Sequence, residues 1–166
     1  MFKMKKELTQ KNKIKLIGLT TRTNNQNEMN PTTGKIGSMI GEFFGNQWNA
    51  KIANRKNPGI TFCIYTEYAS DEHGDYTYFI GEEVNDFDQV PEGMKTLVIP
   101  ASDYQKFTTP AGKMPDIVIQ AWQAIWKMTP EALGGKRAYQ ADFEVYDQRA
   151  QDPENSVVDI YIGVNQ

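Results

Sequence analysis

Two hydrophobic patterns alternate along the chain, and each pattern occurs in both halves of it. Short runs of β-branched and aromatic residues predict strands, and longer stretches with apolar residues three or four positions apart predict helices. We expect one helix between Gly34 and Ile52 and a second from Ile117 to Trp126, ending near Thr129-Pro130. Strands are expected at Ile14–Thr21, Ile60–Tyr68, Asp75–Val84, Lys95–Phe107, Tyr139–Tyr146 and Ser156–Gly163, the fourth of them broken or kinked at Pro100.

The order of these elements is strand, helix and hairpin, and the same order then repeats. It predicts an α+β fold of two tandem βαββ units with pseudo-twofold symmetry, in which antiparallel sheets and two main helices surround a central ligand groove. We place the first unit at about residues 13–88 and the second at about 94–164, within a single domain that spans 13–166. The basic residues 1–12 are expected to form a flexible arm.

The composition argues against several classes of function. The chain has 18 Lys and Arg against 21 Asp and Glu, and the resulting net charge of -3 argues against a protein that coats nucleic acid. One cysteine, Cys63, and one histidine, His73, can form neither an internal disulfide nor the usual zinc site. The N-terminus does not resemble a signal peptide and no apolar run could cross a membrane, so we expect a cytoplasmic protein without metal, cofactor or membrane partner.

Strand alternation assigns the candidate site residues to faces. Glu144 and Tyr146 share one face of their strand, and Tyr65 and Glu67 share one face of theirs. The opposite faces are aliphatic or contain Phe, and we expect them to pack against the two helices. If the duplication brings the two hairpins together, a shared groove is lined by Tyr65, Glu67, Glu144, Tyr146 and Tyr161, with Trp122 and Trp126 as further candidates for its wall.

A carboxylate that is surrounded by aromatic rings suits a lipophilic cation. Burying an unpaired carboxylate is costly, but such a cation supplies the missing charge, and each ring adds about 0.5–2 kcal/mol of cation–π attraction. The alternative interpretation is that Glu67 and Glu144 lie on a solvated sheet face and that the two tryptophans only pack in the core. Both interpretations remain open at this point.

The chain also resembles a known family, the gyrase-inhibitor-like effector-binding domains. The resemblance extends from about Ile14 to Val164, and its most specific parts are Ile-Pro-Ala-x-x-Tyr at 99–104 and Phe-Glu-x-Tyr-Asp at 143–147. Such domains form the ligand-sensing part of multidrug-responsive regulators of the AraC and MerR classes, and they also occur as stand-alone proteins, some of them from integron cassettes. The resemblance implies a tandem βαββ fold with an aromatic pocket and a glutamate that recognises organic cations, which by position is similar to Glu144.

We therefore expect a stand-alone protein that binds hydrophobic or cationic small molecules, with no helix-turn-helix to read DNA. It is expected to be a binding module and not an enzyme, with no catalytic residues. Two alternatives stay open. The pocket glutamate could act as a general base in a small-molecule hydrolase, or the protein could modulate gyrase or another protein partner.

Overall fold

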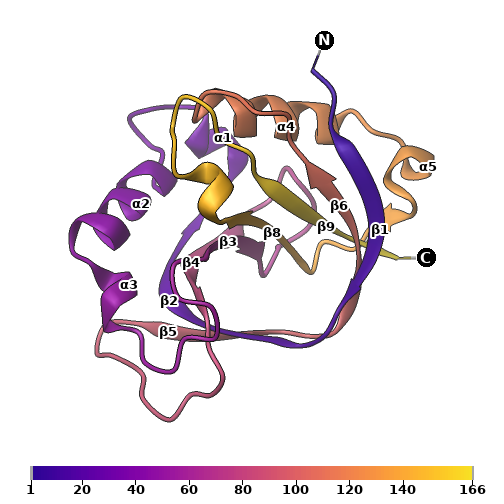
Figure 1. Ribbon diagram of the computed structural model, residues 1–166. Helices are drawn as coiled ribbons and strands as arrows, with labels where there is room; N and C mark the ends of the chain where they lie inside the picture. The colour runs from indigo at the N-terminus through magenta and orange to yellow at the C-terminus, as the bar shows by residue number, and fades with distance from the viewer. Residues whose placement is uncertain (1, 166) are drawn as a thin grey trace.

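The dominant feature of the computed structural model, which describes residues 2–165, is a strongly curved antiparallel sheet with helices on its outer face (Figure 1). The strands follow the order β1-β6-β9-β8-β3-β4-β2-β5, and β7 pairs with β9. Their bounds are β1 Lys5–Lys11, β2 Ile14–Thr23, β3 Thr61–Thr66, β4 Tyr76–Glu83, β5 Lys95–Ile99, β6 Ser102–Thr108, β7 Lys136–Arg137, β8 Ala141–Tyr146 and β9 Asp159–Asn165. The helices are α1 Asn25–Glu28, α2 Ile36–Gly45, α3 Trp48–Lys51, α4 Asp116–Trp126 and α5 Pro130–Leu133, with a 3-10 turn at Gln148–Ala150. The predicted α+β class and antiparallel pairing are confirmed.

A long two-stranded ribbon connects the two ends of the curved sheet. β2 pairs with β5 and β1 pairs with β6 in one continuous register, in which Ile14 lies opposite Ile99 and Lys11 opposite Ser102. The break comes at Pro100, where the sequence predicts it, because proline has no backbone N–H to donate to a strand ladder. In Figure 1 the two strands of the ribbon follow one arc around the lower and right side of the molecule.

Two of the sequence expectations need correction. The basic segment expected to form a flexible arm contains β1, whose backbone pairs with β6 along its whole length while most of its side chains point into solvent. A polar pattern misses an edge strand of this kind, because side-chain composition carries no record of backbone pairing. The helix expected as far as Ile52 ends at Gly45, and Gln47 with a φ of 55° separates it from the single turn of α3.

The faces of the sheet also differ from the expectation. The helices cover the face that carries Glu144, Tyr65 and Tyr146, where α4 packs on Ile160 and Ile162 of β9. The opposite face lines the inside of the curve and forms a separate core. The aromatic and aliphatic residues of that inner core come from seven of the strands and include Leu16, Phe62, Phe79, Ile99, Tyr104, Phe143 and Tyr161. Both faces are therefore buried, so an apolar side chain could not indicate which face the helices cover.

Two glycines allow β2 and β4 to approach closely. Gly18 pairs with Gly81, and a Cβ added at Gly81 would lie 2.1 Å from the carbonyl oxygen of Ile17. Only a residue without a side chain fits there. At Gly37 in α2, by contrast, an added Cβ meets nothing within 4 Å.

We expect Gly81→Ala to lower the free energy of unfolding by about 3 kcal/mol, because backbone atoms of β2 must move to admit the methyl group. Gly37→Ala should raise it by about 0.5–1 kcal/mol, since alanine restricts the unfolded chain and favours the helix. Urea unfolding of both variants and the wild type measures the difference. Equal stability of the two variants would contradict the close packing at Gly81.

Candidate functional site

Glu144 lies in the middle of β8 beneath α4, and only 3% of its surface is exposed. Three donors reach its carboxylate. Oε1 accepts a hydrogen bond from the Tyr146 hydroxyl at 2.6 Å, and Oε2 accepts bonds from the Tyr65 hydroxyl at 2.9 Å and from Nε1 of Trp122 at 2.7 Å. The donors come from β8, β3 and α4. The glutamate is thus the point at which these three elements meet.

The protonation of this cluster follows from its burial. Loss of water raises the pKa of Glu144, and the hydrogen bonds from Tyr146, Trp122 and Tyr65 offset part of that rise. Burial together with the charge of Glu144 raises the pKa values of Tyr65 and Tyr146 well above their usual range. Both hydroxyls therefore keep their protons near neutral pH and act as donors.

The strand register identifies the residue related to Glu144 in the first repeat. Cys63 of β3 lies directly opposite Glu144, and a twofold axis through this pair matches Phe-Cys-Ile-Tyr at 62–65 with Phe-Glu-Val-Tyr at 143–146. Tyr65 and Tyr146 are therefore corresponding residues, and both donate to the same carboxylate. The expected correspondence of Glu67 with Glu144 is wrong by this register.

Two of the candidate residues do not reach the glutamate. The backbone turns at Glu67, whose φ is 51°, so the strand alternation stops there, and its side chain is exposed and accepts a bond from Thr77. Tyr161 pairs with Phe143 on the inner face, with ring centroids 4.7 Å apart and planes 17° apart. Because successive strand residues point to opposite faces, Tyr161 cannot share the face of Glu144.

A cavity of about 390 Å³ opens between α1, α4 and the ends of β3 and β4. Trp122 and Tyr65 form its inner wall, with their rings edge to face at 5.2 Å, and Trp126, 39% exposed, lies in its lining toward solvent. Glu144 is not part of the lining, because these two rings stand between it and the cavity. Further lining is apolar or aromatic and comes from Met29, Ile36, Tyr68, Tyr76, Val118 and Ile119.

The charged lining residues of this cavity were missed by the sequence analysis. Glu28 and Glu72 contribute carboxylates, and Arg137 contributes a guanidinium group that pairs with buried Asp142 at 2.6 Å. A hydrogen bond from the Tyr139 hydroxyl lowers the pKa of Glu72, so this carboxylate is ionised at neutral pH. Alternation along β8 places Asp142 on the same face as Glu144, and this was the one sequence pattern that could have indicated a charged group near the cavity. Glu28 and Glu72 lie in segments that read as loops.

Two kinds of feature were not found in the part of the chain that the structure describes. No cluster of three or more His, Cys, Asp or Glu side chains within residues 2–165 could hold a metal ion. Across the same residues, no helix has both the length and the apolar character needed to span a membrane.

Comparison with known proteins identifies relatives over nearly the whole chain. Residues 7–164 match a family model described as Cass2, integron-associated effector binding protein. YobU of Bacillus subtilis, named as a transcriptional regulator protein, is 28% identical over 152 residues, which are 92% of each chain. The transcriptional regulator BrlR of Pseudomonas aeruginosa is 34% identical over 137 residues, and the match covers 78% of this chain and 49% of BrlR.

A solved structure has a similar fold. An integron cassette protein from the mobile metagenome of Vibrio cholerae superposes with a TM-score of 0.79 at 28% identity, and the match covers 99% of this chain and 97% of that one. The similarity includes both halves of the curved sheet.

The raised pKa of Glu144 has a consequence for stability. The folded state holds the proton more tightly than the unfolded state, in which a glutamate titrates near pH 4. Relative to Glu144→Gln, the free energy of unfolding of the wild type should therefore fall as pH rises from about 4 through the raised pKa. Urea unfolding of both proteins between pH 4 and 8 gives this difference. A difference independent of pH for Glu144→Gln would contradict the cause given for its pKa.

Proposed function

The chain belongs to the Cass2 family of integron-associated effector-binding proteins, and we propose that it binds a lipophilic organic cation in the cavity between α1 and α4. The observation that carries the proposal is the combination of aromatic walls and acidic groups in one cavity. Tyr65, Trp122 and Trp126 offer ring surfaces, and Glu28 and Glu72 add negative charge. Weakly hydrated cations gain from both, because ring faces attract positive charge and carboxylates neutralise it.

The acidic groups have different roles in this proposal. Glu144 holds Tyr65 and Trp122 in place by accepting a hydrogen bond from each. Glu72 lines the cavity itself, and its side chain is 33% exposed, so it can contact a bound cation directly. The charge of Arg137 is matched by its partner Asp142. The charges around the cavity therefore sum to a negative value, which favours a cationic ligand over an anionic one.

The geometry favours binding over hydrolysis at this site. A general base needs a free lone pair within hydrogen-bond reach of a water molecule or a substrate. Three of the roughly four lone-pair sites of the Glu144 carboxylate already accept hydrogen bonds, and the cavity is lined by Tyr65 and Trp122 and not by the carboxylate. A ligand can therefore enter without meeting the carboxylate. No comparable observation supports a gyrase-binding role.

A pair of ligands with the same shape and opposite charge tests the proposal. Tetraphenylphosphonium is a suitable cation, because the protein SAV2435, which shares the fold with a TM-score of 0.76 at 16% identity, was solved bound to it. We expect tetraphenylphosphonium to bind at least about tenfold more tightly than tetraphenylborate, since the two differ mainly in the sign of the charge. Isothermal titration calorimetry measures both. Equal affinities, or tighter binding of the borate, would overturn the proposed cation selectivity.

Three variants test whether the cation binds in the cavity under α4. Glu72→Gln should weaken tetraphenylphosphonium binding roughly fivefold, which corresponds to about 1 kcal/mol for a partly exposed charge pair. Trp126→Ala should weaken it by a similar or larger factor, because one aromatic wall is lost. Glu154→Gln removes the same charge from an exposed position outside the cavity and should bind like the wild type. If all three variants bind alike, the cation does not occupy this cavity.

A further inference from the structure

Among residues 2–165, Arg137 is the one basic residue that lines the cavity under α4. It belongs to the two-residue strand β7, whose pairing with β9 places it opposite Val164. Its side chain is only 9% exposed. A guanidinium group does not lose its proton in proteins, so Arg137 brings a permanently charged and largely buried group to the wall of a cation site. What this group does to a ligand depends on which of its N–H donors already have partners.

Asp142 occupies one nitrogen of the guanidinium group. Nη2 of Arg137 donates to Oδ2 of Asp142 at 2.6 Å, and no other carboxylate of residues 2–165 lies within 4.0 Å of the arginine. Oδ2 also accepts the Tyr68 hydroxyl, and Oδ1 accepts the backbone N–H of Gly163. The aspartate therefore already has three donors, and it holds Arg137 through a single bond instead of the two parallel bonds of a bidentate pair.

The other two nitrogens of Arg137 have no acceptor. Nε is buried and has no hydrogen-bond partner within residues 2–165. Nη1 forms no hydrogen bond with these residues either, but unlike Nε it is not enclosed by them. A guanidinium group has five N–H donors, and those on Nε and Nη1 are all unpaired here. Because an unpaired donor in a desolvated place is unfavourable, an acceptor that reaches Nη1 gains binding energy.

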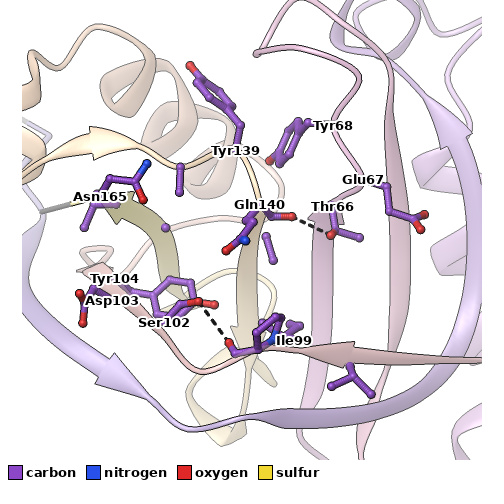
Figure 2. A pocket seen from close by; sticks show the side chains of 16 residues that line it. Thr66, Glu67, Tyr68, Ile99, Ser102, Asp103, Tyr104, Tyr139, Gln140 and Asn165 are labelled. Atoms are coloured by element: carbon purple, nitrogen blue, oxygen red, sulfur yellow. Dashed lines mark hydrogen bonds between the residues drawn. The ribbon is translucent and has the colours of Figure 1, made fainter.

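Tyr139 covers one face of the guanidinium group. Cζ of Arg137 lies 4.4 Å from the centroid of the Tyr139 ring, and the hydroxyl of this tyrosine donates to Glu72. Tyr139 lines a second cavity, on the inner side of the sheet, where Figure 2 shows it beside Tyr68. Arg137 does not line that second cavity, so an acceptor for Nη1 has to come from the cavity under α4.

From this arrangement we propose that the cation bound under α4 also carries a neutral oxygen acceptor, such as a ketone or amide carbonyl, which accepts a hydrogen bond from Nη1 of Arg137. The inference rests on the cation site proposed above and specifies the class of its ligand. An anionic acceptor is disfavoured because Glu28 and Glu72 line the same cavity. The charge of Arg137 is matched by Asp142, so the arginine acts as a hydrogen-bond donor without cancelling the selectivity for cations.

Two phosphonium ions of the same shape and charge test the proposal. (4-Oxopentyl)triphenylphosphonium carries a C=O group where (4-methylpent-4-enyl)triphenylphosphonium carries C=CH₂. We expect the wild type to bind the ketone at least about fivefold more tightly in calorimetric titrations, because hydrogen bonds from a charged donor are strong. The alkene is the more hydrophobic of the two, so transfer out of water favours the opposite order and cannot produce this preference.

Arg137→Lys tests the role of the guanidinium group. Lysine keeps a positive charge opposite Asp142 but lacks the planar fork that presents further donors to the cavity, so the preference for the ketone should be lost. Arg149→Lys makes the same substitution at another aspartate-paired arginine, outside the cavity lining, and should keep the wild-type preference. Each protein is titrated with both ligands, so a general change in the cavity affects both affinities and cancels in their ratio.

Infrared spectroscopy of the bound ketone detects the hydrogen bond directly. With an isotopically labelled carbonyl, the C=O stretching band should lie at lower frequency in the wild-type complex than in the Arg137→Lys complex, because a hydrogen bond to the oxygen weakens the C=O bond. A purely structural role of Arg137 would not move this band.

Equal affinity of the wild type for the two phosphonium ions would overturn the proposal and would mean that water satisfies the guanidinium group. A ketone preference that persists in Arg137→Lys would overturn it as well. If that variant does not fold, the comparison of the two ligands in the wild type still decides. Binding of neither phosphonium ion would contradict the proposed cation site itself, whereas equal binding of both leaves that site intact.

Discussion

The buried carboxylate of Glu144 is the constraint on which the rest of the site depends. A carboxylate removed from water is tolerated only where hydrogen bonds replace the water, and here three neutral donors do so. The donors belong to β3, β8 and α4, so the carboxylate fixes the position of a helix on the sheet as well as its own. The rings of Tyr65 and Trp122 become the inner wall of the cavity because they are the donors to this one group.

The broken symmetry of the duplication has a physical reason at the same point. Cys63 occupies the position opposite Glu144, where side chains of paired strands come within about 5 Å of each other. A second glutamate at this position would place two buried carboxylates side by side, and one of them would have to remain protonated. A small neutral residue avoids that repulsion and leaves room for tyrosines from both repeats. The repeats can therefore share a fold and a tyrosine while only the second one has a carboxylate at this position.

The sequence predicted the class of the fold, the break at Pro100 and the cluster of Glu144 with Tyr146, Tyr65 and Trp122. These succeeded because alternation along a strand and spacing along a helix determine faces directly. The predicted placement of Tyr161 was wrong because strand alternation defines two faces but does not identify the one that the helices cover, and here both faces are buried. The predicted placement of Glu67 was wrong because its own left-handed backbone conformation ends the strand alternation, and no side-chain pattern indicates that turn. The acidic lining from Glu28 and Glu72 lies in loop segments, whose position depends on tertiary contacts.

A second carboxylate on β8 holds the side chain of Tyr68, which lines both the cavity under α4 and the second cavity, of about 620 Å³, on the inner side of the sheet. Asp142 lies two residues before Glu144 on the same face and is fully buried, and it accepts bonds from Tyr68, Arg137 and the backbone N–H of Gly163. Tyr68 lines both cavities, and its hydroxyl is held by this aspartate at 2.6 Å. Asp142 is itself held by its ion pair with Arg137 and by the hydrogen bond from Gly163, so the side chain of Tyr68 is fixed to the sheet. The carboxylate of Glu144 has only neutral donors, whereas the charge of Asp142 is matched by Arg137. One strand therefore supplies both the carboxylate that holds the inner wall of the cavity under α4 and the carboxylate that holds Tyr68.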